Sequence, residues 1–191
     1  MKCVAINGST RKQGNTALLI EMVFEVLRSQ GIDCELLQIG NQTIQGCTGC
    51  GTCRKQKNNQ CVITDDSVND YVKRLADSDA ILLGSPTYFA DVTANMKALI
   101  ERLGRVAAAN DSLFSHKIGA SIVAVKRAGG IHAFNTLNNF FLVSNMVVVG
   151  SCYWNVGFGG AIGEVQQDRT AQTTMETLGK NIAWLMKKLD K

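Results

Sequence analysis

Four of the seven cysteines fall within one short stretch in the first third of the sequence. Cys47, Cys50 and Cys53 follow one another at intervals of three, with glycines between them, and Cys61 comes eight residues later. Thiols at this spacing on a short loop are typical ligands of an iron-sulfur cluster. The simplest interpretation is one cluster, expected to be [4Fe-4S], with these four cysteines as its metal ligands.

Three other interpretations of the four cysteines stay open. Zinc is often bound by four cysteines, although zinc ribbons usually present two C-x2-C pairs with a longer spacer. A C-x2-C pair can cycle between dithiol and disulfide, but two thiols would then have no role. The fourth interpretation is a loop of buried, inert cysteines, because spacing is compatible with a metal without proving one.

A polar, glycine-containing loop follows the first apolar run, residues 2–7, and leads into an expected helix. Backbone N–H groups and the dipole at a helix N-terminus attract an anion. The loop lacks both the Gly-Lys-Ser/Thr of a triphosphate loop and the G-x-G-x-x-G of a dinucleotide loop. A phosphate monoester fits best, and a plain connection with a helix-capping threonine is the alternative. The candidate cofactor-binding residues here are Ser9, Thr10, Arg11, Gly14, Asn15 and Thr16.

Two further loops follow apolar runs that have the character of buried strands, at residues 80–85 and 117–125. The first loop contains the only proline of the chain and two aromatic residues, which suggest contact with a flat ring, although such pairs more often serve plain packing. The second contains two adjacent glycines, which permit close approach of the backbone to a ligand. The candidate cofactor-binding residues in these loops are Pro86, Thr87, Tyr88, Phe89, Arg127, Ala128, Gly129 and Gly130.

The elements that must position these loops alternate between strand and helix. Apolar runs predict strands at 2–7, 34–39, 80–85, 117–125 and 145–149, and helical periodicity fills the intervals, with a last helix over 168–189. Right-handed crossovers then give an α/β, flavodoxin-like, doubly wound five-stranded parallel sheet of order 2-1-3-4-5. We expect one domain over 1–191, with the cysteine-rich loop, about 40–64, inserted after the second strand. The glycine-rich segment 150–163 has no assignment.

Ligands of such sheets bind at the carboxyl ends of the strands. FMN satisfies both halves of this edge, with its phosphate on residues 9–16 and its ring against residues 86–89. We expect the flavin and the cluster to lie at the same end of one subunit. No general acid or base is then required, and His116 and His132, which flank the fourth strand, are interpreted as structural because neither has a carboxylate or cysteine companion in the sequence.

The composition limits which classes of protein the chain can belong to. With 46% hydrophobic and 19% charged residues the chain is globular, and its formal charge of +4 comes from lysines and arginines that are scattered rather than gathered into a nucleic-acid-binding stripe. No apolar run has the length of a membrane span or a signal peptide. Seven cysteines, an odd number, favour a reducing cytoplasm, with Cys3, Cys34 and Cys152 as reduced core thiols.

With these motifs assembled, the sequence resembles the iron-sulfur flavoproteins, a branch of the flavodoxin-like NAD(P)H-dependent FMN reductases, over nearly its whole length. Residues 8–16 resemble the phosphate loop of that group, residues 84–89 its flavin-ring loop, and the compact cysteine motif its iron-sulfur branch, although the interval between Cys53 and Cys61 is long. The resemblance implies FMN, one [4Fe-4S] cluster, and a homodimer or homotetramer in which the cluster loop approaches a neighbouring subunit's flavin.

The resemblance also implies an oxidoreductase that carries electrons between a one-electron donor, such as ferredoxin, and a two-electron, small-molecule acceptor. The alternative is an NAD(P)H-dependent reductase of quinones or free flavin, in which the cysteine loop is structural or binds zinc. A third class is a non-enzymatic FMN-binding or redox-sensing module.

Overall fold

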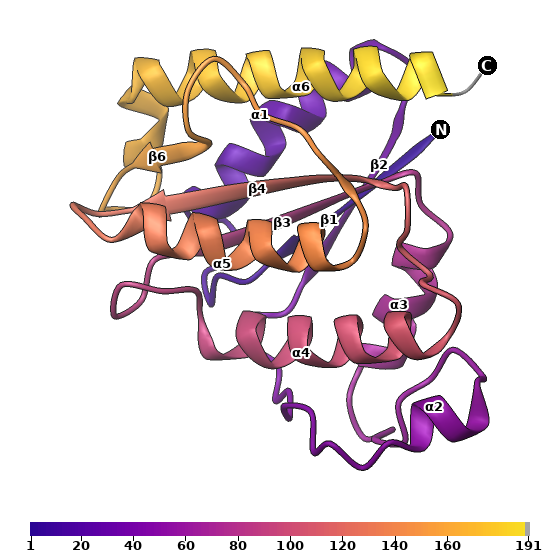
Figure 1. The fold of residues 1–191 in the computed structure, drawn as a ribbon. Helices are drawn as coiled ribbons and strands as arrows, with labels where there is room; N and C mark the ends of the chain where they lie inside the picture. The colour runs from indigo at the N-terminus through magenta and orange to yellow at the C-terminus, as the bar shows by residue number, and fades with distance from the viewer. Residues whose placement is uncertain (190–191) are drawn as a thin grey trace.

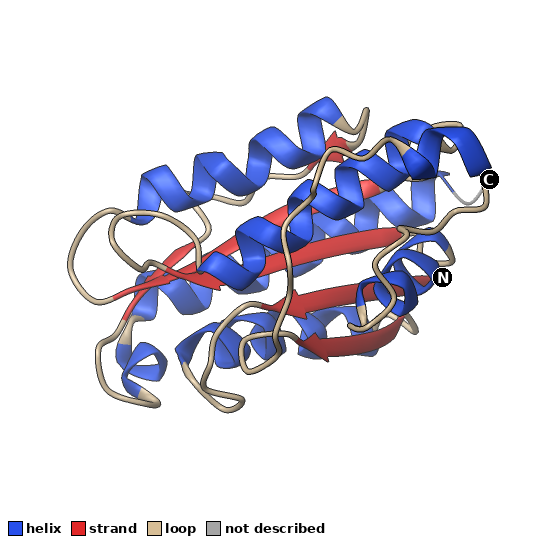
Figure 2. Cartoon of the chain, turned by 90° about the horizontal axis from the view of Figure 1, so that it is seen from below, coloured by secondary structure: helices blue, strands red, loops and turns tan. Residues whose placement is uncertain are grey.

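The computed structural model describes residues 1–189, which form a parallel sheet covered by helices on both faces (Figures 1 and 2). The strand order is β2-β1-β3-β4-β5, as expected from the sequence, with β6 also paired to β4. The strands are β1 (Lys2–Asn7), β2 (Asp33–Gln38), β3 (Ala80–Pro86), β4 (Ile118–Val125), β5 (Val147–Val148) and β6 (Val156–Phe158). The helices are α1 (Asn15–Ser29), α2 (Thr52–Gln56), α3 (Val68–Ala76), α4 (Ala94–Ala109), α5 (Gly130–Val143), the 3-10 helix η1 (Glu164–Gln167) and α6 (Arg169–Leu189).

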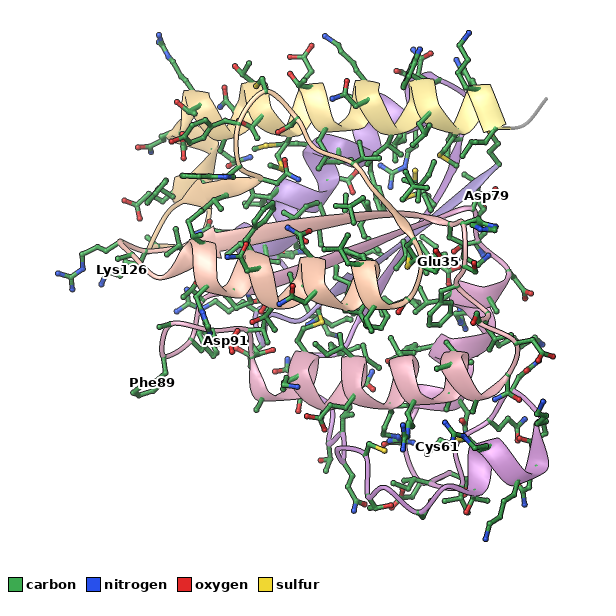
Figure 3. All side chains as sticks on the ribbon, in the orientation of Figure 1. Glu35, Cys61, Asp79, Phe89, Asp91 and Lys126 are labelled. Atoms are coloured by element: carbon green, nitrogen blue, oxygen red, sulfur yellow. The ribbon has the colours of Figure 1, made fainter. Side chains whose placement is uncertain are left out.

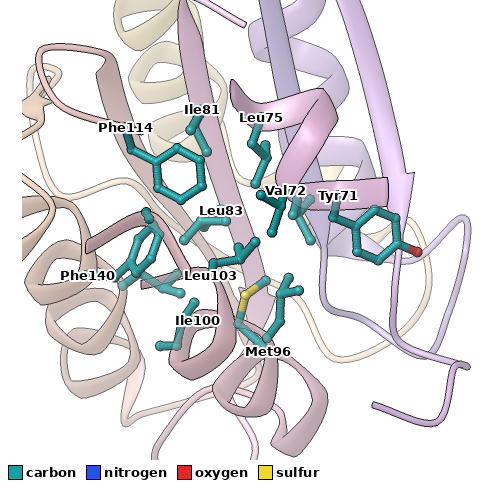
Figure 4. Packing of buried hydrophobic residues seen from close by; sticks show 14 of the residues in the cluster. Tyr71, Val72, Leu75, Ile81, Leu83, Met96, Ile100, Leu103, Phe114 and Phe140 are labelled. Carbon is teal, nitrogen blue, oxygen red and sulfur yellow. The ribbon is translucent and has the colours of Figure 1, made fainter. Parts of the chain in front are cut away.

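The three central strands, β1, β3 and β4, carry continuous apolar runs because they are covered on both faces. Alternate side chains point to opposite sides of the sheet, so each strand contributes to two cores. One core packs beneath α1 and α6, and the other packs beneath α3, α4 and α5, where Leu83 of β3 meets Met96 of α4 and Phe140 of α5 (Figure 4). The two cores hold the loops at the carboxyl edge in place.

The last strand differs from the expectation. Instead of one strand over 145–149, two short strands occupy that edge, β5 beside the start of β4 and β6 beside its end. The chain leaves the sheet between them, and the segment 150–163, which had no assignment, returns through β6. Sequence periodicity cannot reveal a strand of two or three residues, since alternation needs a longer run to be recognised.

All seven cysteines are free thiols. Cys3 is buried, and burial raises the pKa of its thiol, while burial of the half-exposed Cys34 raises its pKa to about 11. Cys152 is exposed, so its expected place in the core is wrong. None of the helices within residues 1–189 has both the length and the apolar character that crossing a membrane requires.

Candidate functional site

The loops after β1 and β3 meet the end of β4 and the segment after β6 at a cavity of about 260 Å³. The cavity therefore joins the loops after β1 and β3 and the end of β4, all next to candidate residues, with the segment after β6, which had no assignment. Its wall consists of Ser9, Arg11, Asn15, Thr16, Pro86, Thr87, Tyr88, Ala124, Lys126, Gly159 and Gly160. Of these, Ala124, Lys126, Gly159 and Gly160 were missed, and Lys126, directly after β4 (Figure 3), adds a second cation to the wall that contains Arg11.

The loop after β1 is folded by its own polar groups. The amide of Ser9 donates to Oδ1 of Asn7 at 3.0 Å, and the amide of Arg11 donates to Oγ of Ser9 at 3.1 Å. Gly40, after β2, passes so close that a Cβ there would lie 1.9 Å from the carbonyl oxygen of Ser9. The loop is thus held by its own hydrogen bonds and by the backbone at Gly40, so its conformation is fixed where it enters α1.

Two hydroxyls at the cavity are buried without a hydrogen-bond partner, Oγ1 of Thr16 and Oγ1 of Thr87. The first amides of a helix have no partners within it, and α1 has no side-chain cap at its N-terminus to satisfy them. Buried polar groups in proteins are nearly always paired, so orphans that converge on one cavity indicate a polar ligand. A phosphate group fits this donor set, since the dipole of α1 favours an anion there.

We expect Thr16→Val to weaken FMN binding by about 1 to 3 kcal/mol, the worth of a hydrogen bond to a charged acceptor. The flavin-free variant should melt at or above the wild-type temperature, because valine removes a buried hydroxyl that has no partner. Titration of flavin-free protein with FMN and thermal melts measure the two effects. Thr16→Ser, which keeps the hydroxyl, is the control, and unchanged affinity in Thr16→Val would move the phosphate elsewhere.

The side chain of Asn15, a predicted cofactor-binding residue that lines the cavity, is hydrogen-bonded within the protein. Its Nδ2 donates to the carbonyls of Gly159 at 2.9 Å and Ala161 at 2.8 Å, and its Oδ1 accepts from the amide of Gly163 at 3.0 Å. The side chain is therefore occupied in holding segment 159–163 against the start of α1. Its contribution to the cavity is to fix the wall that Gly159 and Gly160 form.

Loss of this clamp should loosen the cavity wall. We expect Asn15→Ala to lower the free energy of unfolding by about 1 to 3 kcal/mol, because it leaves the partners of three hydrogen bonds unpaired. Limited proteolysis should cut within 159–163 faster than in the wild type. Asn181→Ala removes a single exposed bond, from Nδ2 to the carbonyl of Gly150, and should change neither measurement.

The aromatic loop after β3 forms a tight turn in which Tyr88 and Asp91 pair across a bridge and both central residues, Phe89 and Ala90, have positive φ. The hydroxyl of Tyr88 lies 3.3 Å from that of Thr10, so Tyr88 leans toward the phosphate loop. Phe89 is fully exposed and points out from the tip of the turn (Figure 3). In this arrangement Tyr88, and not Phe89, faces the cavity.

Asp91 fixes the foot of this turn. Its Oδ1 accepts from the hydroxyl of Thr136 and from the amide of Val92, each at 2.7 Å, and its Oδ2 lies 3.5 Å from Nε2 of His132. Burial opposes ionisation of the carboxyl, but these partners outweigh it and lower the pKa of Asp91. The expectation that His132 has no carboxylate companion is therefore wrong, because the turn brings Asp91 beside it.

The turn after β4, residues 127–130, lies against the aromatic turn. Gly129 has φ +84°, and a Cβ there would lie 3.1 Å from the Cα of Ala90. Arg127, Ala128, Gly129 and Gly130 line a second cavity of about 380 Å³, whose far wall includes Tyr153, Trp154 and Phe158. The sequence did not assign these three aromatic residues to the site, since they lie in the segment that had no prediction.

The cysteine segment, residues 47–61, lies away from the edge of the sheet that carries the two cavities. The segment runs beneath α4 and contacts the C-terminal half of that helix, where the thiol of Cys53 lies 3.8 Å from the carbonyl of Arg105. At the other end of α4, the side chain of Asn95 donates to the carbonyl of Gly40, which precedes the segment. Helix α4 rises by about 15 Å between Asn95 and Arg105. In Figure 3 Cys61 lies under α4, and Phe89 and Lys126 lie at the opposite end of the molecule. The sequence led us to expect both centres at one end of a subunit, whereas Cys53 and Cys61 lie away from the cavity.

The four cysteines differ in their surroundings. Cys53 is buried, Cys61 is half-buried, and Cys47 and Cys50 are exposed. Hydrogen bonds from the hydroxyl and amide of Thr52 and from the hydroxyl of Thr48 lower the pKa of the Cys50 thiol, and the amide of Gly49 lies 3.5 Å from the sulfur of Cys47. Four free thiols with N–H and O–H donors to sulfur are a donor set that fits an iron-sulfur cluster.

The sulfur atoms are not gathered around one point. Among residues 1–189 no three cysteine, histidine, aspartate or glutamate side chains converge as they would around a metal ion. Gly49 and Gly51 both have positive φ, and the segment carries only the five-residue helix α2. The four donor thiols are present, but in this structure they do not form one ligand group.

The chain is similar to known proteins in family, sequence and fold. Residues 1–161 match the family described as NADPH-dependent FMN reductase. An iron-sulfur flavoprotein of Methanocaldococcus jannaschii is 34% identical over the whole length of both chains, and one of Archaeoglobus fulgidus is 35% identical over 96% of this chain and 79% of its own. The crystal structure of a WrbA-like flavodoxin from Agrobacterium tumefaciens aligns with a TM-score of 0.66 at 13% identity, covering 98% of each chain, which supports the fold.

Proposed function

Because the chain belongs to the iron-sulfur flavoprotein branch of the NADPH-dependent FMN reductase family, we propose that it transfers electrons between a one-electron donor, such as a ferredoxin, and a two-electron, small-molecule acceptor. Membership in the family makes it a flavin-dependent oxidoreductase that binds FMN. The identity of the electron donor, the identity of the acceptor and the presence of a [4Fe-4S] cluster are our proposals.

The observation that carries the flavin site is the pair of orphaned hydroxyls, those of Thr16 and Thr87, at a cavity with a helix N-terminus and two cations. Thr16, Ser9 and the first amides of α1 would hold the phosphate, with Arg11 and Lys126 neutralising its charge. Tyr88 and the turn 127–130 would hold the ring, and Asp91 keeps the Tyr88 turn in shape. Bound FMN would supply the two-electron chemistry.

For the metal we propose Cys47, Cys50, Cys53 and Cys61 as ligands of one [4Fe-4S] cluster, which would supply one-electron chemistry. The two anchored thiols, Cys53 and Cys61, would fix the position of the centre on α3 and α4. The two exposed thiols, Cys47 and Cys50, lie on a segment whose glycines can turn the sulfurs inward. Cluster insertion would therefore reorganise the exposed half of the segment only.

The arrangement of the two sites favours exchange between subunits. In Figure 1 the chain around α2 lies below α4, whereas the end of β4, which lines the cavity, lies at the far left of the sheet, so the two sites of one chain lie apart. We propose that the chain forms a homodimer or homotetramer in which the cysteine segment of one subunit faces the flavin of another. Sedimentation of FMN-loaded protein tests this, and a monomer that still passes electrons from cluster to flavin would rule it out.

Protein purified without oxygen provides the direct test of the whole proposal. We expect one FMN per chain, about four iron and four sulfide per chain, and a broad visible shoulder beneath the flavin bands. Stopped-flow mixing with reduced ferredoxin should bleach the shoulder before the flavin. Iron-free protein whose flavin is bleached rapidly by NADPH would instead identify the second candidate below.

The second candidate is an NAD(P)H-dependent reductase of quinones or free flavin with a structural or zinc-binding cysteine segment. Two observations favour it, the cavity of about 380 Å³ with aromatic walls beside the turn 127–130 and the four thiols that do not converge. Zinc at one per chain with no sulfide, together with turnover of NADPH and a quinone, would decide for this function.

A further inference from the structure

Arg102 is a buried cation beneath the cysteine segment. It lies on α4, and its side chain has no exposed surface. Its guanidinium forms an ion pair with Asp66, whose side chain is 5% exposed, and Nη2 donates to the carbonyl of Ile63 at 2.9 Å. A guanidinium in this position is fully removed from water, so each of its donors requires a partner.

The partners of Arg102 flank the four cysteines in the sequence. Gln45, whose carbonyl accepts from Nη1 at 3.4 Å, precedes Cys47, and Ile63 follows Cys61. One side chain thus fastens both ends of the cysteine segment to α4. Arg102 therefore sets how the two halves of the segment stand relative to each other.

Cys61 lies beside this guanidinium. Its backbone is held by Asn69 of α3, which accepts from the amide of Cys61 at 2.7 Å and donates to its carbonyl at 3.0 Å. Burial alone would lower the pKa of Arg102, but hydrogen bonding to Asp66 and to the Cys61 thiol raises it. The remaining donor, Nε–H, is buried without a partner. A fixed positive charge and an unused N–H donor therefore lie in the same buried site as Cys61.

Stability alone does not account for this arrangement. Removing a guanidinium and a carboxylate from water costs about as much as their attraction returns, and apolar side chains of similar volume usually serve a core equally well. A buried cation with a free donor is instead suited to a neighbouring negative group. Hydrogen bonds to ligand sulfurs and nearby charge are among the factors that set the reduction potential of an iron-sulfur centre.

We propose that Arg102 is a positioning residue of the four-cysteine site, which fastens the segment around Cys61 and supplies buried N–H donors that raise the reduction potential of the centre bound there. The proposal rests on the cluster proposed above. It assigns the ion pair of Arg102 and Asp66 to the electron-transfer chemistry and not to the core.

The test compares three variants with the wild-type protein, all purified without oxygen. Arg102→Gln combined with Asp66→Asn removes the charges as a neutral pair, so that neither partner is left buried and unpaired. Arg102→Lys keeps the charge and loses the planar fork. Arg105→Gln, an exposed arginine on the same helix, is the control for loss of a surface charge. FMN content and melting temperature report folding.

Two measurements test the role of Arg102, a midpoint potential and an alkylation rate. Redox titration followed by electron paramagnetic resonance should give a lower midpoint potential in the neutral pair, with Arg102→Lys nearer the wild type and Arg105→Gln unchanged. In metal-free protein, alkylation of Cys61 by iodoacetamide should be at least about tenfold faster in the neutral pair, because the segment opens locally, while buried Cys3 stays protected.

The outcomes separate the two proposals. A neutral pair with full iron content and the wild-type potential overturns the role of Arg102 while leaving the cluster in place. Loss of iron from the neutral pair, with FMN retained and Arg105→Gln unaffected, supports it. If the wild-type protein binds no iron, the cluster assignment fails, and the alkylation rates alone decide whether Arg102 fastens Cys61.

Discussion

Protein carrying Cys50→Ser should retain a full complement of FMN and lose nearly all of its iron. Serine replaces the sulfur whose thiolate form is favoured by the donors around it, those of Thr52 and Thr48, and a hydroxyl does not substitute for it as a soft ligand. The flavin should be unaffected because Cys50 does not line the cavity, and the neighbouring Cys53 lies against Arg105 in the far half of α4. Iron, sulfide and FMN assays on protein purified without oxygen measure all three quantities.

The matched control for this variant is Cys152→Ser. Cys152 is also an exposed free thiol, but it lies outside the cysteine segment, so its replacement should leave iron, sulfide and FMN at wild-type levels. Loss of flavin together with iron in Cys50→Ser would mean that the two sites form one cooperative unit. Full iron content in Cys50→Ser would remove Cys50 from the ligand set.

Gly40→Ala should have the largest effect on stability. A Cβ at Gly40 would lie 1.9 Å from the carbonyl oxygen of Ser9, 2.1 Å from its carbonyl carbon and 2.5 Å from the amide of Thr10. These are backbone atoms, so no side chain can rotate away, and the phosphate loop itself must move. We expect a loss of about 3 kcal/mol or more in the free energy of unfolding and a loss of FMN binding. Chemical denaturation and FMN titration measure both.

Gly150→Ala separates steric overlap from the general effect of replacing a glycine. A Cβ at Gly150 has no heavy atom within 4 Å and its φ is not in the left-handed region, so this variant should match the wild type in both measurements. Near-normal FMN affinity in Gly40→Ala would show that the loop after β1 can shift without losing the phosphate, which would weaken the assignment of that loop.

The sheet order and the edge that carries the cavity could be predicted because both depend on local patterns. Continuous apolar runs at β1, β3 and β4 indicate strands covered on both faces, and polar loops directly after them must meet at one edge. The position of Thr16 at this edge could be predicted for the same reason, because it lies in the first turn of the helix that follows β1.

The parts that could not be predicted depend on contacts between remote residues. Asn15 meets Gly159 across 144 positions in sequence, and His132 meets Asp91 only because the turn at Phe89 folds back. Arg102 borders the apolar face of α4, and its burial follows from the cysteine segment that covers it. Nothing in a pattern of residue types distinguishes such an arginine from one that is solvated.

The hydrogen bonds between Asn15 and segment 159–163 have a consequence for biosynthesis. The wall of the cofactor cradle comes from near the end of the chain, so a polypeptide still on the ribosome has only half of the cradle until Gly163 has left the exit tunnel. Cofactor uptake should therefore be a late event, and ribosome-stalled chains shorter than this should release FMN readily even when their first four strands are already folded.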